Sequence, residues 1–420
     1  MNTGHIQKSN TQIKFAFAAF LAVLLYVITY KYNLNILSIG NISDLLEHTI
    51  PAESITADTF WSVWLIRPYI LWHLCVKFFI QFCSMPTFHA AACTCGAFAV
   101  FNYYVTFWIL EKVSVHITKK DTAVISAVVS AMLSLVQPLY IPWINAYQYE
   151  GQFSINPIFN PTHMAVKPFG LLAFAVAVDL LLRYKEKDTI FFKGEKSKKW
   201  LYVIFALFLF LSTIAKPTFI YMLIPTGIVF VLIELVIALL RKDKSWKKTW
   251  NLMWKLACAC LPSLIYLILE YSAFYIWGGT SEDASVAIYP FLTGWHLYSA
   301  NVPASIVMGM SLPLWMIITS PRYFIKSVEG RLGALAYAVG ALEFSFFVET
   351  GERLAHLNFA WPLMSGMLLL WVMAGCRLIQ RTVSEDDSLK NKLIISVGWI
   401  LLSIHVFSGL YYINPSAYIL

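Results

Sequence analysis

Long apolar segments recur along the whole chain and alternate with short polar connections. A bilayer core of roughly 30 Å needs about 20 apolar residues of helix, because no water is present there to satisfy an unpaired backbone group. The pattern predicts about 11 to 12 transmembrane helices. Their ranges are 14–31, 64–83, 87–110, 122–143, 164–182, 200–216, 219–240, 256–277, 303–319, 332–348, 360–376 and 391–412.

Composition agrees with this pattern. Of the 420 residues 59% are hydrophobic and only 13% are charged, which excludes a soluble multidomain enzyme, a secreted disulfide scaffold and a disordered chain. We therefore expect an all-α polytopic membrane protein in which residues 1–420 form a single transmembrane domain. The first apolar segment is too long, and too poorly followed by small residues, for a removed signal peptide, so we expect a membrane anchor.

The positions of Lys and Arg predict the orientation, because short cytoplasmic loops carry a positive excess. Residues 183–199 hold seven Lys or Arg, 241–255 hold six and 322–331 hold three. These loops and the N-terminus are therefore expected in the cytoplasm. The net charge of +8 is then mostly a topological signal, and no basic aromatic module points to a nucleic-acid partner.

One region conflicts with this orientation. If 64–83 and 87–110 both cross the membrane, the loop from Glu111 to Lys120 lies outside, although Lys112, Lys119 and Lys120 favour the inside. Either one of the two segments is re-entrant or interfacial, or the positive-inside rule fails locally.

Four cations lie on the predicted outer side, against the general trend. Charges at the membrane boundary are costly and are functional candidates by default. Lys167 and Lys216 lie near predicted helix ends, where a cation can bind a phosphate or pyrophosphate at the level of the lipid headgroups. The alternative is that each long side chain only snorkels toward water. The four are Arg67, Lys167, Lys216 and Arg353, and both lysines precede a proline.

The first outer loop, residues 32–63, carries acids on segments that we expect to form short amphipathic helices. If residues 41–48 are helical, Asp44 lies on one face with Glu47 and with His48. Such a face could deprotonate an acceptor hydroxyl or hold a divalent cation. The alternative is a solvated helix on the membrane surface. No sequence motif indicates any other cofactor, and the H-E-x-x-H zinc motif is absent.

The second outer loop, residues 144–163, interleaves aromatic, amide and hydroxyl groups. Its two Asn-Pro steps, at Asn156 and Asn160, force extended or turn backbone. Aromatic rings stack on sugar faces and amides bind sugar hydroxyls, so these asparagines and His163 are candidate sugar-binding residues. The alternative is a capped helix connection among the lipid headgroups.

The third outer loop, residues 349–359, concentrates charge within two helical turns of a very apolar chain. Sugar or acceptor binding and a purely structural ion pair between helices both fit this cluster. Its candidate residues are Glu349, Glu352, Arg353, His356 and Asn358.

In these features the chain resembles the GT-C class of integral-membrane glycosyltransferases and the related bacterial polysaccharide polymerases. The shared pattern is an N-terminal span, an acid-bearing first outer loop, and a second apolar segment that opens with the Pro-Tyr stretch at residues 67–73. The Asn-Pro-Thr stretch at 160–162 and the Glu-Arg-x-x-His-x-Asn stretch at 352–358 are also similar. The first loop departs from the usual pattern because it has no Asp-Asp or Asp-Glu doublet.

The resemblance implies transfer of a sugar from a polyprenyl phosphate or pyrophosphate to a glycan or lipid acceptor at the outer face of a bacterial inner membrane. Asp44 or Glu47 would be the base, and the four outer cations would bind phosphate. The rival hypothesis is a flippase that carries a lipid-linked sugar without changing it. Sugar or acceptor contacts would come from Asn156, Asn160, His163, Glu349, Glu352, His356 and Asn358.

Overall fold

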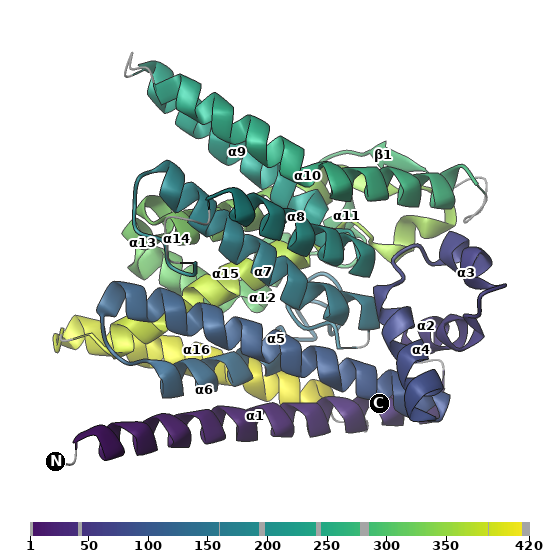
Figure 1. Ribbon diagram of the computed structural model, residues 1–420, viewed down its shortest axis with the longest axis horizontal. Coiled ribbons are helices and arrows are strands. Elements are labelled where there is room, and N and C mark those ends of the chain that lie inside the picture. The colour runs from purple at the N-terminus through teal and green to yellow at the C-terminus, as the bar shows by residue number, and fades with distance from the viewer. Residues whose placement is uncertain are drawn as a thin grey trace.

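The computed structural model describes residues 3–40, 44–158, 160–192, 198–240, 245–277, 285–384 and 386–413. The described chain is almost entirely helical, and eight of its helices are long and apolar enough to cross a membrane (Figure 1). The predicted all-α polytopic membrane architecture is confirmed. The eight are α1 (Thr3–Ile39), α5 (Thr87–Thr118), α7 (Pro161–Tyr184), α9 (Thr218–Leu240), α10 (Ser245–Tyr275), α12 (Val302–Thr319), α15 (Ala360–Thr382) and α16 (Leu389–Ile413).

Two helices form the centre of the bundle. In the apolar stretches of α7 and α15, 89% and 94% of the residues are buried inside the protein, against 17% in α1 and α10. Figure 1 shows α7 and α15 in the middle, with α1 along one side and the α9–α10 pair along the other. The outer helices therefore present their apolar side chains to lipid, which explains their high exposed hydrophobic content.

Close backbone approach joins α15 to its neighbour α14 (Val328–Phe346). A Cβ atom on Gly366 would lie 2.6 Å from the carbonyl oxygen of Ala336, and one on Gly340 would lie 2.9 Å from that of Pro362. Small residues at a helix interface allow such close contact. Within a membrane, where the hydrophobic effect does not drive helices together, this van der Waals packing stabilises their association.

Three further apolar helices are shorter than the eight, and two of them, α4 and α6, are also shorter than the predicted spans. A helix of 13 residues is only about 20 Å long, so α4 and α6 are too short to cross a membrane alone. The predicted span 64–83 is interrupted at residues 67–70, where Pro68 follows the short helix α3 (Phe60–Ile66). The predicted span 122–143 ends before Pro138. The three helices are α4 (Leu71–Cys83), α6 (Ala123–Leu135) and α8 (Lys198–Ala215).

The break before α4 favours a re-entrant or interfacial 64–83 segment over a local failure of the positive-inside rule. The loop after α5 lies at the end of the bundle that holds the N-terminal part of α1. There Lys14 forms an ion pair with Asp121, and the Lys120 ammonium donates to the carbonyl oxygen of Val383 at 3.0 Å. The basic connections therefore share one end, as a re-entrant or interfacial 64–83 segment requires.

Short elements gather at the opposite end and frame a cavity. The helix α1 continues to Ile39, so the loop predicted from residue 32 begins about two turns later. Strands β1 and β2 pair antiparallel, with Val286 opposite Glu349. The basic end holds one more short helix, α13 (Pro321–Lys326). The framing elements are α2 (Asp44–Ser54), α3, α11 (Thr293–His296), β1 (Val286–Ile288), β2 (Phe347–Glu349) and the 3-10 helix η2 (Gly351–His356).

The glycine contact between α14 and α15 predicts a stability effect. Gly366→Ala should lower stability by about 1–3 kcal/mol, because the new methyl group meets backbone atoms that cannot rotate away. Gly227→Ala in α9 is the matched control, since nothing lies within 4 Å of its Cβ position. Thermal unfolding in detergent measures both, and equal midpoints for the two variants would contradict this account of the interface.

Candidate functional site

A cavity of about 400 Å³ opens at the end of the bundle where α2, η2 and the α8–α9 connection meet. Its size lies within the range of roughly 300–1,000 Å³ that is usual for small-molecule sites. Three carboxylates and three cations line it, so opposite charges balance in a partly desolvated space. These six residues are Asp44, Glu47, Glu150, Arg67, Lys216 and Arg353.

Lys216 lies in the wall of this cavity. It occupies the break between α8 and α9, because the following Pro217 disfavours helical backbone at the residue before it. The ammonium is 3.1 Å from the side-chain oxygen of Asn160 and 3.7 Å from the ring centroid of Trp361. Burial lowers the pKa of Lys216 to about 7, although the negative charges of Asp44 and Glu270 act in the opposite direction.

Asn160 connects Lys216 to the first outer loop. Its side-chain oxygen caps α7 by accepting from the backbone N–H of His163 at 2.9 Å, and it also accepts from the Lys216 ammonium. Its amide nitrogen donates to Asp44 Oδ2 at 2.8 Å. One amide therefore holds an acid from α2 and a lysine from the α8–α9 connection at the start of α7.

The two acids of α2 both reach the cavity. Asp44 and Glu47 lie one turn apart at the start of the helix, as predicted, and both are exposed. The carboxylate of Glu47 is 3.8 Å from the Arg67 guanidinium. This separation and the exposure of Glu47 make the pair weak, so its carboxylate remains accessible to a ligand.

His48, one turn after Asp44, lies at the buried side of the same cavity. Its Nδ1 is 3.1 Å from Nε2 of His73 in α4. Burial, together with the neighbouring His73, Arg67 and Lys216, holds the pKa of His48 well below its usual range. His48 is therefore neutral near pH 7 and adds no further cation to the site.

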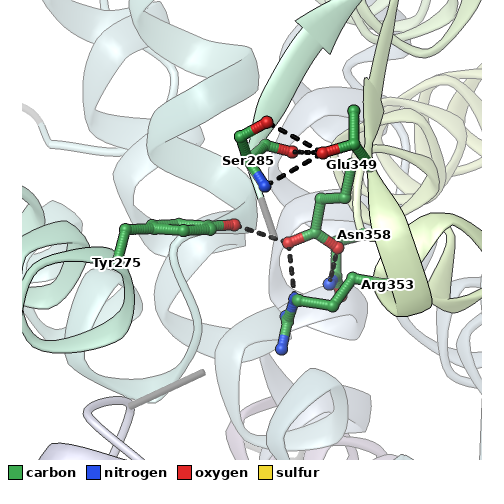
Figure 2. A network of polar contacts seen from close by, with 6 residues as sticks. Tyr275, Ser285, Glu349, Arg353 and Asn358 are labelled. Carbon is green, nitrogen blue, oxygen red and sulfur yellow. Dashed lines mark hydrogen bonds and ion pairs between the residues drawn. The ribbon is translucent and has the colours of Figure 1, made fainter. Parts of the chain in front are cut away.

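Glu349 organises the third outer loop (Figure 2). Its Oε1 accepts from Arg353 Nε at 2.9 Å and from the Tyr275 hydroxyl at 2.6 Å, and its Oε2 accepts from the Asn358 amide. Ser285 links the start of β1 to the end of β2. Its carbonyl oxygen accepts a hydrogen bond from the backbone N–H of Thr350 at 2.9 Å. A buried carboxylate with three donors is a positioning group, and here it directs Arg353 toward the cavity.

A smaller cavity of about 120 Å³ lies beside the first. Lys216 and Arg353 line both cavities, as do Tyr69 and Trp361. The smaller one also contains Glu270 of α10, whose Oε2 has no hydrogen-bond partner among the described residues. Lys216 and Arg353 therefore lie between the exposed acids Asp44 and Glu47 of the larger cavity and the buried acid Glu270 of the smaller one.

The remaining predicted residues lie elsewhere. Lys167 donates to the Asn156 side chain at 2.9 Å, and both are buried away from the two cavities. His163 is fully buried against Trp361, with ring centroids 5.1 Å apart, and does not line either cavity. The side chains of Glu352 and His356 lie outside the described residues.

Aromatic residues and two acids of this site, Glu150 and Glu270, were not among the predicted candidates. Trp361 and Tyr69 flank the Lys216 ammonium, and Tyr149 lines the larger cavity. Glu270 carried the clearest signal, because a carboxylate within an apolar helix is costly unless it has a partner or a function. Tyr69 lies in the Pro-Tyr stretch at residues 67–73, whereas Trp361 and Tyr149 had no distinguishing signal in a chain so rich in aromatic residues.

Among the described residues, no three His, Cys, Asp or Glu side chains gather closely enough to hold a metal ion. The divalent cation considered for the first loop therefore stays an expectation. No protein-family model matches this chain, and no curated protein matches its sequence.

The burial of Lys216 predicts how stability depends on pH. The unfolded chain keeps this proton up to a pKa of about 10.5, whereas the folded protein releases it near pH 7. Unfolding therefore takes up a proton between these values, and stability should rise with pH from about 7 toward 10. Lys216→Met should remove this contribution. Melting temperatures should be measured for both proteins across this pH range. The same pH dependence in both would contradict a lowered pKa of Lys216.

Proposed function

We propose that the protein is a membrane glycosyltransferase that transfers a sugar or oligosaccharide from a polyprenyl phosphate or pyrophosphate to a glycan or lipid acceptor. The reaction would serve the synthesis of cell-surface polysaccharide or glycolipid. The observation that carries this proposal is the placement of Lys216 and Arg353 in one cavity with Asp44 and Glu47. Such a cavity offers a phosphate clamp and an accessible base together.

Lys216 and Arg353 are the groups best suited to the donor phosphate. The only side-chain acceptor of Lys216 among the described residues is the neutral Asn160, so its charge is not matched by a carboxylate in direct contact. Arg353 binds Glu349 through Nε, which leaves its terminal nitrogens for a ligand. Charge-assisted bonds from such donors strengthen as the leaving phosphate gains negative charge.

Asp44 and Glu47 are the candidate bases. In the reaction, an acceptor hydroxyl oxygen bonds to the anomeric carbon while the bond from that carbon to the phosphate oxygen breaks. The phosphate leaves with the bonding electron pair, and the hydroxyl proton passes to the carboxylate. Asp44 is the better placed of the two, because its carboxylate is held by Asn160, which also binds Lys216.

The aromatic lining and the membrane setting fit a lipid-linked sugar. Trp361, Tyr69 and Tyr149 line the cavity and offer aromatic surface against which a pyranose can pack. If the basic loops lie in the cytoplasm, with the N-terminus, the cavity opens to the outer face of a bacterial inner membrane. A donor with its chain in the lipid would then enter laterally between helices.

Loss of Lys216, one of the two cations of the phosphate clamp, should strongly slow transfer. Purified protein in nanodiscs, incubated with polyprenyl-linked sugars and oligosaccharides, should give a product of increased mass by mass spectrometry. Lys216→Met should reduce its formation by about 10²–10³-fold, a loss typical for one group that stabilises developing negative charge. Lys326→Met, at the opposite end of the bundle, is the control. Lipid that binds without any chemical change would instead favour the flippase.

Substitution of the acids should identify the base. Asp44→Asn should lower the transfer rate by about 10²–10⁴-fold, while Glu47→Gln should have a smaller effect. Binding of the donor should change little in either variant, because the proposed mechanism assigns the donor phosphate to Lys216 and Arg353 and only the acceptor proton to the carboxylates. Full transfer activity in both variants would remove the base from this mechanism.

A further inference from the structure

A third charged cavity, which we call the basic cavity, lies at the opposite ends of the helices that carry the candidate site. It has a volume of about 260 Å³ and lies between the end of α7 and the beginnings of α8 and α10. Arg183, Lys248 and Lys255 line it, together with the polar side chains of Asn251 and Tyr202. Its described lining includes no Asp or Glu, so the cavity favours an anion.

Among the residues that the structure describes, carboxylates match the two lysines of this lining only incompletely. Lys248 contacts Glu186 at 2.6 Å, but 81% of the Glu186 side chain is exposed, so that pair is weak. The Arg183 guanidinium donates to the carbonyl oxygen of Phe192 at 2.9 Å. Among the described residues Lys255 has no carboxylate within ion-pair distance.

Exposed tryptophans place this cavity at the level of the lipid headgroups. Trp246, Trp250 and Trp254 follow one another at one-turn intervals on α10, and Trp200 lies at the start of α8. All four are exposed. Tryptophan concentrates at membrane–water interfaces, where its ring is amphipathic, and Lys248 and Lys255 occupy the same turns of α10.

Apolar walls continue from the basic cavity toward the membrane interior. Leu180 and Leu252 line the cavity itself. The next residues of the same helices, Leu181 and Met253, line a further cavity of about 310 Å³ whose wall is almost wholly apolar. A ligand with a phosphate and a hydrocarbon chain would match both parts, whereas a free anion would use only the first.

We propose that the basic cavity binds the phosphate of an anionic phospholipid, with Lys248, Lys255 and Arg183 as its cationic contacts. This site is separate from the proposed transfer site and does not depend on it. Basic pockets between transmembrane helices at the cytoplasmic side are suited to anionic headgroups. The lipid would fill the space between α7, α8 and α10 and hold these helices together at the basic end.

Native mass spectrometry of the delipidated protein, titrated with phosphatidylglycerol or phosphatidylcholine, tests this proposal. We expect phosphatidylglycerol to bind more tightly. The Lys248→Gln/Lys255→Gln double variant should lose about 25-fold in that affinity, or about fivefold per lysine, and should bind phosphatidylcholine as before. Lys247→Gln is the matched control, because Lys247 lies over the Trp246 ring and does not line the cavity.

Three outcomes would overturn the proposal. The first is an unchanged affinity of the double variant for phosphatidylglycerol. The second is an equal loss in Lys247→Gln, which would indicate a general basic surface. The third is thermal protection by inorganic phosphate as strong as that by phosphatidylglycerol, which would indicate a free-anion site. Unchanged phosphatidylcholine binding and an unchanged melting midpoint without lipid show that the double variant is folded.

Discussion

The hydrogen bonds of Asn160 hold the candidate site together, because they join three segments that are distant in the sequence. Asp44 lies 116 residues before Asn160 and Lys216 lies 56 residues after it. A buried ammonium at the edge of an apolar bundle is costly unless its protons find acceptors. The amide provides one without neutralising the charge, so the lysine stays buried and still attracts an anion.

Electrostatic balance explains why the neighbouring groups are arranged around this bridge. Glu349 receives three donors and is therefore satisfied within the protein, whereas Asp44 and Glu47 remain exposed. The acids thus divide between a structural role and an accessible one. The same division separates the cations, since Lys167 is bound by Asn156 in the interior while Lys216 faces the cavity.

The helices α7, α8 and α10 link the two ends of the molecule. Asn160, Lys216 and Glu270 lie toward one end of these helices, and the opposite ends line the basic cavity. The cavities at the two ends differ in kind, because those of the candidate site combine cations with carboxylates, whereas the described lining of the basic cavity holds cations without carboxylates. A site with carboxylates and cations can accept a proton and stabilise a departing phosphate, whereas a site with cations alone suits retention of an anion.

The sequence by itself determined the membrane class of this protein, the positions of most spans and the collection of polar residues in three loops. These features depend on local apolar length and on proline and asparagine signals, such as the cap at Asn160 and the break at Pro217. The sequence pattern could not separate Lys167 from Lys216, since each precedes a proline at an expected helix end. Only the tertiary structure decided that one is enclosed and the other lines a cavity. It also decided that Trp361 lies over Lys216, because that contact joins residues far apart in the chain.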